Sequence, residues 1–343
     1  MSNNDPHRFQ LCIIEGDGIG REVIPAAQTV LRAAGLPFDA VHAEAGWDCF
    51  EQHGTALPDE TVALARRSDA VLFGAVSSPS RRVPGYASPI VELRRRLDLF
   101  ANLRPAHSWP IAASRPGIDL LIVRENSEGL YVRRERREGD TAIAERVISR
   151  PGAERIARVA CAWAMRRRKQ LTIVHKANVL PETCGLFRQT ALDVAAAHPA
   201  LTVGEMLVDA MALRLVTHPQ RYDVIVASNL FGDILSDEAA GLVGGMGLAP
   251  SANVGATRSP ALFEPVHGSA PDIAGQGVAN PIAAILSAAM LLDHFDERER
   301  AARVRRAVEQ VIRRGPRTPD LGGTATTTQV VRAIERQIIN GKN

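Results

Sequence analysis

Short apolar runs alternate with longer segments of helical periodicity along most of the 343 residues. The run FQLCIIE at 9–15 leads through GDGIG into EVIPAAQTVLRAA at 22–34, and the runs DAVLFGA, DLLIVRE, LTIVHKA and YDVIVAS follow later. Such alternation is typical of α/β proteins with largely parallel strands. The sequence therefore predicts an α/β fold, in a chain long enough for one large or two medium domains.

Composition excludes several classes of protein. No apolar run approaches the ~20 residues that a membrane-spanning helix needs, and the N-terminus lacks the apolar core of a secretory signal. The formal net charge is only +3, and we interpret the basic runs at 133–137 and 166–169 as solvated faces rather than a nucleic-acid surface. The cysteines are far apart and form no CxxC pair, which predicts reduced thiols and a cytoplasmic location: Cys12, Cys49, Cys161 and Cys184.

Two helices can be predicted in detail. Ser88 is a good N-cap and Pro89 is favoured at the first helical position, so a helix is expected to begin there. Near the C-terminus, Val304, Val308 and Ile312 recur at helical spacing and predict a helix face in the core.

Gly16, Gly18 and Gly20 stand between a predicted strand and a predicted helix. Helix N-termini bind phosphate, so a dinucleotide-binding turn is one interpretation. The spacing is GxGxG rather than GxGxxG, and no second strand ending in an acid follows at the proper distance. The sequence therefore argues against a Rossmann fold.

Asp233 and Asp237 are four residues apart in SNLFGDILSDEAAGL and share one face of a predicted helix. Two unpaired carboxylates there would repel each other unless a cation lay between them, and their oxygens suit Mg²⁺ or Mn²⁺. A solvated acidic face is an equally good interpretation of this motif alone. Asp209, beside apolar residues, is the candidate third ligand.

Three other residues have side chains suited to proton transfer. Lys176 follows the strand-like LTIVH, where ligands bind in open α/β sheets, and is a candidate base. His175 is the competing candidate, and a structural role is an alternative for both. Tyr131 is a candidate proton donor, although half-buried packing is the commoner fate of a tyrosine.

Three arginines lie at the edges of predicted elements: Arg94, Arg104 and Arg124. Because arginine pairs bidentately with carboxylates, their convergence would suit a di- or tricarboxylic acid. The Gly-rich segment FEPVHGSAPDIAGQGVANP would allow close backbone approach to a ligand. Within it, Asp272 could accept hydrogen bonds from a ribose hydroxyl and would repel a 2′-phosphate.

Together these motifs resemble the β-decarboxylating dehydrogenases that act on isocitrate, isopropylmalate, homoisocitrate and tartrate. GDILSD, HGSAPDIAG and HKANVL carry the resemblance, which runs from Glu15 to Thr318 and beyond. It implies a non-Rossmann, isopropylmalate-dehydrogenase-like fold with two lobes, the first discontinuous (1–99 and 252–343) and the second at 100–251. It also implies a homodimer or a dimer of dimers, with 127–147 as the dimer arm.

The resemblance implies roles for individual residues. Arg94, Arg104 and Arg124 would bind the malate portion of the substrate, and Tyr131 would be the general acid. Lys176 would be the base and Asp209 a metal ligand, both supplied by the other subunit, while Asp233 and Asp237 would complete the Mg²⁺ or Mn²⁺ site. Asn178 would lie near substrate and nicotinamide. The residues implied in NAD binding are Glu264, His267, Gly268, Ser269, Ala270, Pro271, Asp272, Ile273 and Asn280.

The segment YASPIVELRRR at 86–96 occupies the place where this family reads the γ-substituent of its substrate. SPIV followed by LRR, and RENSEGLYV at 124–132, are similar to homoisocitrate enzymes, which implies conversion of homoisocitrate to 2-oxoadipate in lysine biosynthesis. Ser78 would then touch substrate. Val91 stands where some homoisocitrate enzymes have an extra arginine, which disfavours isocitrate. With Ile90 it leaves 3-isopropylmalate as the first alternative, before isocitrate or a tartrate- or malate-type substrate.

A noncatalytic regulatory subunit would have lost catalytic residues, whereas Lys176, Tyr131 and the three aspartates are all present. The sequence therefore favours an enzyme that acts on a small 2-hydroxy acid, with no nucleic-acid or membrane partner.

Overall fold

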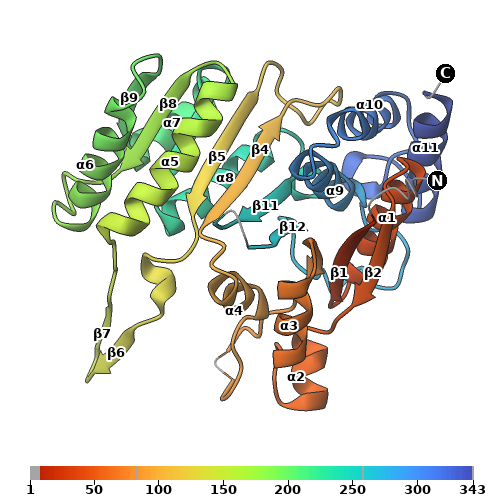
Figure 1. Ribbon diagram of the computed structural model, residues 1–343, viewed down its shortest axis with the longest axis horizontal. Coiled ribbons are helices and arrows are strands. Elements are labelled where there is room, and N and C mark those ends of the chain that lie inside the picture. Colours follow the sequence, from red (N-terminus) through yellow and green to blue (C-terminus); the bar gives the residue numbers. More distant parts are fainter. Residues whose placement is uncertain (1–7, 82, 257–258, 342–343) are drawn as a thin grey trace, which may run out of the picture. The chain divides into compact units, whose positions relative to one another are not determined.

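The computed structural model describes residues 8–81, 83–256 and 259–341. The chain forms two compact units. Unit 1 comprises residues 1–97, 109–114 and 244–343, and unit 2 comprises residues 98–108 and 115–243. Both units combine strands with helices, so the predicted α/β class is confirmed (Figure 1).

The strands of unit 1 pair in the order β2–β1–β3–β12–β11. Neighbours are parallel except β11 and β12, which are antiparallel. Leu11 to Ile14 and all of β3 are buried, which is why both strands read as continuous apolar runs in the sequence. The bounds are β1 Phe9–Gly16, β2 Phe38–His42, β3 Ala70–Ala75, β11 Pro250–Val254 and β12 Ala261–Pro265.

One almost completely buried helix, α9 (Ile282–His294), is at the centre of the helical layer of unit 1. It contacts β11 and β12 as well as α1 (Gly20–Ala33) and α10 (Arg298–Arg314), and α11 (Thr327–Asn340) packs against α1 and α10. The predicted core face of α10 is confirmed, since Val304, Val308 and Ile312 are fully buried. The remaining helices of unit 1 are α2 Trp47–His53, α3 Asp59–Arg67 and α4 Pro89–Arg96.

Helix α4 begins where the sequence predicted. Pro89 is its first residue and Ser88 is the N-cap, although the Ser88 side chain makes no capping hydrogen bond. Two short 3-10 turns also belong to unit 1, Met246–Leu248 and Pro319–Leu321.

The strands of unit 2 pair in the order β4–β5–β10–β8–β9. All neighbours are parallel except β4 and β5. Arg124 near the end of β5 is level with Ala227 at the end of β10, and Ala227 is level with Val174 in β8, so the segments that follow these strands emerge at one edge of the sheet. The bounds are β4 Ala101–His107, β5 Asp119–Glu125, β8 Gln170–His175, β9 Thr202–Leu207 and β10 Val224–Ala227.

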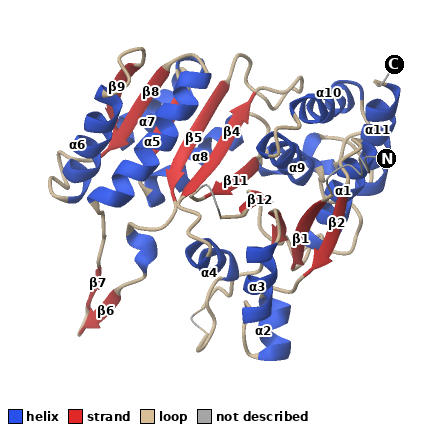
Figure 2. Cartoon of the chain, viewed as in Figure 1, coloured by secondary structure: helices blue, strands red, loops and turns tan. Residues whose placement is uncertain are grey.

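Helices cover both faces of the sheet in unit 2 (Figure 2). Helices α5 (Arg150–Arg166) and α6 (Thr183–Ala196) pack together, as do α7 (Val208–Thr217) and α8 (Asn229–Leu242). The segment predicted as a dimer arm contains the exposed hairpin of β6 (Glu135–Glu138) and β7 (Thr141–Ala144), which points away from the rest of unit 2. Two more 3-10 turns, Leu130–Val132 and Pro219–Arg221, complete the unit.

Two predictions from composition can be compared with the structure. All four cysteines are free and buried, as expected for reduced thiols. No helix in the described part of the chain is long and apolar enough to cross a membrane.

Candidate functional site

Two arginines predicted to bind substrate are buried in unit 2. Arg104 lies on β4 and is 9% exposed, and Arg124 lies on β5 and is 2% exposed. A buried guanidinium must be paired and hydrogen-bonded to offset its loss of hydration. Both side chains meet helix α8, which supplies that pairing.

Asp233 on α8 is the main acidic partner of these arginines. Its Oδ1 forms an ion pair with Arg124 Nη1 and lies 3.1 Å from Arg104 Nη1. Arg124 is held further by Asn229, whose Oδ1 accepts hydrogen bonds from Nε at 3.0 Å and Nη2 at 2.8 Å. The guanidinium of Arg124 is therefore fixed on two sides by residues of one helix.

Asp237 lies one turn further along α8 and completes the cluster. Its Oδ1 is 3.0 Å from Arg104 Nη1. Burial raises the pKa of the Asp237 carboxyl, and the charge of Arg104 opposes that rise. Asp233 and Asp237 are therefore not the unpaired carboxylates expected from the sequence, because Arg104 lies within ion-pair distance of both.

Tyr131, in the 3-10 turn Leu130–Val132, faces the same cluster. Its hydroxyl donates a hydrogen bond of 2.5 Å to Asp233 Oδ2, and its ring lies under the Arg124 guanidinium with 5.0 Å between Cζ and the ring centre. Burial, together with the hydrogen bond to Asp233, raises the pKa of Tyr131. The phenol is therefore kept protonated, as a proton donor must be.

Sequence reasoning missed three polar residues that position the arginines. Asn102 Oδ1 accepts from Arg104 Nε at 2.7 Å, Ser236 Oγ accepts from Arg104 Nη1 at 2.7 Å, and Asn229 binds Arg124. Asn102 could have been found from the strand period, because residues i and i+2 point to the same face of β4. The other two stand in the motif that supplied the aspartates.

Gly232 allows α8 to approach β5 closely. A Cβ at this position would lie 2.8 Å from both Cβ and Cγ of Arg124. Any larger residue would displace the arginine or the helix, so the glycine before Asp233 sets the distance between Arg124 and its acidic partner.

Lys176 and Asp209 form a second, separate pair. Lys176 follows β8, Asp209 lies in the first turn of α7, and Nζ is 2.5 Å from Oδ1. The hydrogen bond from Lys176 is the main cause that lowers the pKa of Asp209. Among the described residues of a single chain, no three His, Cys, Asp or Glu side chains form a metal-binding group, so Asp209 does not join Asp233 and Asp237 there.

His175, the competing candidate base, is buried at the end of β8. Its Nδ1 accepts a hydrogen bond from the Ala177 N–H, and burial lowers its pKa. These contacts suit a neutral histidine inside the unit. Lys176 is one quarter exposed and is the more accessible of the two. Asn178, which follows it, is exposed.

The third arginine, Arg94, belongs to unit 1. It is 9% exposed on α4, and its Nη2 lies 2.6 Å from Glu264 Oε1 at the end of β12. Asn253 Nδ2 donates to the same oxygen at 2.7 Å. In this unit Glu264 holds Arg94 in place. Val91, one helical turn before Arg94, is half-buried.

The Gly-rich segment after β12 contacts the GDGIG turn of the same unit. Ile19 N–H donates to Ser269 O at 2.9 Å, and a Cβ on Gly18 (φ +53°) would lie 2.1 Å from that oxygen. Ser269 Oγ also lies 2.8 Å from Ser77 Oγ, next to the exposed Ser78. Gly18 is therefore explained by backbone packing, which removes the main reason to interpret the turn as a Rossmann phosphate site.

Several features of this segment fit a bound dinucleotide. Among the described residues, His267 Nε2 is buried without a hydrogen-bond partner. A Cβ on Gly268 would meet nothing within 4 Å, which leaves the backbone open to a ligand. Pro271 and Asp272 are exposed, Ile273 is half-buried, and Ala270 has a positive φ of 39°. Asn280 is buried and donates to Asp320 Oδ2 at 2.8 Å.

The acidic residues fit a hard divalent cation. Asp233 and Asp237 offer carboxylate oxygens, the donors that Mg²⁺ and Mn²⁺ prefer. Arg104 and Arg124 are already in contact with them, so a cation would share these oxygens with the arginines. Two carboxylates supply only part of the coordination shell of such a cation, and its other ligands would be water, substrate oxygens or further side chains.

Comparison with known proteins identifies the family to which the chain belongs. A family model described as isocitrate/isopropylmalate dehydrogenase matches residues 10–334. An isocitrate/homoisocitrate dehydrogenase of Thermus thermophilus is 60% identical over 327 residues, covering 95% of this chain and 97% of its own. A 3-isopropylmalate dehydrogenase of Archaeoglobus fulgidus is 50% identical over 327 residues, covering 95% and 98%. The crystal structure of an isocitrate dehydrogenase from Methylococcus capsulatus superposes with a TM-score of 0.92 at 42% identity, covering 96% and 99%.

Proposed function

Because the chain belongs to the isocitrate/isopropylmalate dehydrogenase family, we propose that it oxidises homoisocitrate with NAD⁺ and releases the β-carboxylate as CO₂, giving 2-oxoadipate. The observation that carries the proposal is the cluster of Arg104, Arg124, Tyr131, Asp233 and Asp237 in unit 2. It combines cations for carboxylates, oxygens for a metal and a protonated phenol. The first alternative substrate is 3-isopropylmalate.

The arginines would hold the carboxylates of the substrate. Arg104 and Arg124 have fixed guanidiniums, so little conformational entropy is lost when they bind an anion. Arg94 would bind a further carboxylate, positioned by its ion pair with Glu264. The binding energy of these groups would orient the 2-hydroxyl group for oxidation.

Lys176 and Tyr131 would move the protons. Lys176 would accept the hydroxyl proton as the alcohol is oxidised, and Tyr131 would donate a proton to the carbon from which CO₂ has left. When bound, the divalent cation supplies electrophilic polarisation of oxygen and NAD⁺ supplies a hydride acceptor. Asp209, Asp233 and Asp237 would hold the cation.

The complete site would form between two copies of this chain. Lys176 and Asp209 pair with each other within one chain, and in the described part of that chain no third carboxylate joins Asp233 and Asp237. Large apolar side chains are exposed beside both groups in unit 2: Val179, Leu180, Leu213, Val216 and Ile234. A second copy packed there would cover these side chains and bring its Lys176 and Asp209 to Asp233 and Asp237.

The cofactor would bind in the lobe formed by 1–99 and 252–343, and the metal in the lobe at 100–251. The buried His267 Nε2 and the open backbone at Gly268 support the segment 264–273 as the binding site. Asp272 is exposed and acidic, so it would repel a 2′-phosphate and favour NAD⁺ over NADP⁺.

Homoisocitrate is preferred because of the residues before Arg94 and the names of the relatives. Ile90 and Val91 are apolar and add no charge to α4, so Arg94 is the buried cation of this helix. The Thermus thermophilus relative is named for isocitrate and homoisocitrate, and a homoisocitrate dehydrogenase of Methanocaldococcus jannaschii is 48% identical over 335 residues.

The test is NADH formation by the purified chain with homoisocitrate, isocitrate, 3-isopropylmalate and tartrate in parallel, each with Mg²⁺ or Mn²⁺ and with EDTA. We expect the highest kcat/KM for homoisocitrate and loss of activity in EDTA. A higher kcat/KM for 3-isopropylmalate would contradict homoisocitrate as the preferred substrate. Undiminished activity after metal removal would contradict the requirement for a divalent metal.

A further inference from the structure

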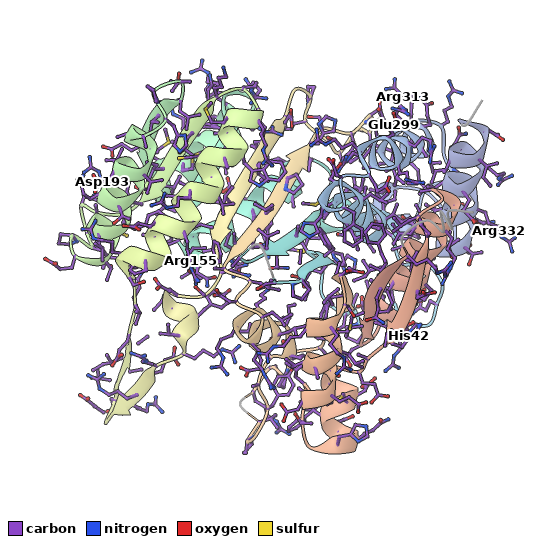
Figure 3. All side chains as sticks on the ribbon, in the orientation of Figure 1. His42, Arg155, Asp193, Glu299, Arg313 and Arg332 are labelled. Atoms are coloured by element: carbon purple, nitrogen blue, oxygen red, sulfur yellow. The ribbon has the colours of Figure 1, made fainter. Side chains whose placement is uncertain are left out.

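A strongly basic pocket lies in unit 1, where α10 ends and α11 begins. It has a volume of about 650 Å³, and five of its lining residues are arginines: Arg313, Arg314, Arg317, Arg332 and Arg336. Within the described part of the chain, no Asp or Glu lines this pocket. Arg313 on α10 and Arg332 on α11 are both at the surface (Figure 3).

The arginines differ in how they are used by the fold. Arg317 donates to the carbonyl oxygens of Ile312 and Arg313, which are exposed by the end of α10, so it has a structural role. Arg313 is paired with Glu309 at 2.7 Å. Within the described ranges, Arg314 and Arg332 have neither an ion pair nor a side-chain hydrogen bond.

Apart from Glu309, which pairs with Arg313, the acidic residues nearest along the chain do not neutralise the pocket. Asp320 accepts hydrogen bonds from Asn280 and Thr318 and does not line it. Glu335 lies on α11 but also does not line it. Like charges gathered around one cavity repel one another, and an anion in the cavity would relieve that repulsion.

The walls allow a ligand to approach the backbone. Gly315 (φ +79°) and Gly322 (φ +75°) have left-handed backbone conformations, which account for glycine at both positions, and a Cβ on either would meet nothing within 4 Å, so no neighbouring atom covers the backbone there. The N-terminus of α11 is closed by a capping box between Thr326 and Gln329, so the arginines, and not the helix terminus, would provide the attraction.

We propose that this pocket binds a small polyphosphate anion, such as the phosphate chain of a nucleotide. The volume falls in the range of about 300 to 1,000 Å³ that is typical of small-molecule sites, and guanidiniums pair bidentately with phosphate oxygens. The pocket shares no lining residue with the segment 264–280 proposed for the cofactor, so it is a second site on the same unit.

The experiment is isothermal titration calorimetry of the full-length protein with inorganic tripolyphosphate. Sodium sulfate, whose anion has a single tetrahedral group, is the comparison. We expect tripolyphosphate to bind at least about 10-fold more tightly than sulfate, because several guanidiniums can engage one ligand. The double variant Arg314→Gln, Arg332→Gln should weaken tripolyphosphate binding at least about 10-fold. Saturating NAD⁺ should leave it unchanged.

The matched control is Arg306→Gln, Arg158→Gln, which removes the same charge from exposed arginines outside the pocket. Equal weakening of tripolyphosphate binding in both double variants would mean that the anion is attracted by the overall positive charge of the protein. That result would contradict a specific site in the pocket. Displacement by NAD⁺ would assign the ligand to the cofactor site instead. Binding of a single-stranded oligonucleotide without binding of tripolyphosphate would also overturn the proposal. None of these outcomes depends on catalytic activity, so failure of the proposed function would be seen separately.

Discussion

Asp233 is the residue at which the interactions of the unit 2 cluster meet. One carboxylate oxygen faces Arg124 and Arg104, and the other accepts the hydroxyl of Tyr131. A side chain with so many fixed partners has a defined orientation before any ligand binds, and such preorganisation is what an active site requires. The individual residues therefore carry the sharpest tests.

Replacing Tyr131 with Phe removes the proposed proton donor and keeps the ring under Arg124. We expect kcat with homoisocitrate to fall by about 100-fold to 10,000-fold, the range of general acid catalysis. The control is Tyr222→Phe; among the described residues, the Tyr222 hydroxyl makes one side-chain hydrogen bond, to Met206 Sδ at 3.8 Å. Steady-state kinetics and circular dichroism of both variants check the prediction, and near-normal kcat in Tyr131→Phe would rule out Tyr131 as the acid.

Replacing Val91 with Arg adds a cation one helical turn before Arg94 on α4, on the same face. We expect the ratio of kcat/KM for isocitrate to that for homoisocitrate to rise by about 10-fold, as one charge-assisted hydrogen bond allows. Val91→Leu, which keeps an apolar side chain, is the control. An unchanged ratio in Val91→Arg would show that this position does not read the substrate.

At the scale of elements, helix α8 does most to build the cluster. It supplies Asn229, Gly232, Asp233, Ser236 and Asp237 within its first three turns. Its approach to β5 depends on the absence of a side chain at Gly232. A second glycine, Gly241, lies near the other end of the same helix in open surroundings.

These glycines give a matched pair of substitutions. Gly232→Ala should lower the free energy of unfolding by about 1 to 3 kcal/mol, because its Cβ overlaps Arg124. Gly241→Ala should raise it by about 0.5 to 1 kcal/mol, because alanine is the better helix former and meets nothing there. Urea denaturation measures both, and equal effects of the two substitutions would contradict the close contact of α8 with β5.

Some elements could be predicted from local sequence patterns, whereas the contacts between elements could not. Buried parallel strands such as β3 and β10 read directly as apolar runs, and α10 was visible from the spacing of Val304, Val308 and Ile312. The pairing of Arg104 with both aspartates was not visible, because β4 and α8 are more than 120 residues apart and no local pattern records their contact. The role of Gly18 was equally hidden, since it depends on a loop 251 residues later.

At the scale of the whole molecule, the buried, neutral His175 makes the free energy of unfolding depend on pH. Burial lowers the pKa of His175, and its Nδ1 accepts a hydrogen bond, which only the neutral ring can do. The unfolded chain therefore takes up the proton at a higher pH than the folded one. Stability is complete above the unfolded pKa of about 6.5 and falls as the pH decreases towards the lower folded pKa.

We expect the free energy of unfolding to decrease between about pH 7 and pH 5.5, and His175→Gln to reduce this slope. Urea denaturation at a series of pH values measures it. His42→Gln, at an exposed histidine on the surface of unit 1 (Figure 3), should leave the slope as in the unaltered protein. If His175→Gln kept the full slope, protonation of His175 would not be its cause.

The most direct measurement uses two variants that are each inactive. Lys176→Met lacks the proposed base and Asp233→Asn lacks a proposed metal ligand, so each alone should lose activity by orders of magnitude while remaining folded. If the site is shared between copies, a mixed dimer has one intact site, made from Asp233 of one chain and Lys176 of the other. Unfolding and refolding the two variants together in equal amounts should restore homoisocitrate-dependent NADH formation to about a quarter of the unaltered rate, since half of randomly formed dimers are mixed. No recovery above the separate variants, with dimers present, would contradict a catalytic site built from both groups.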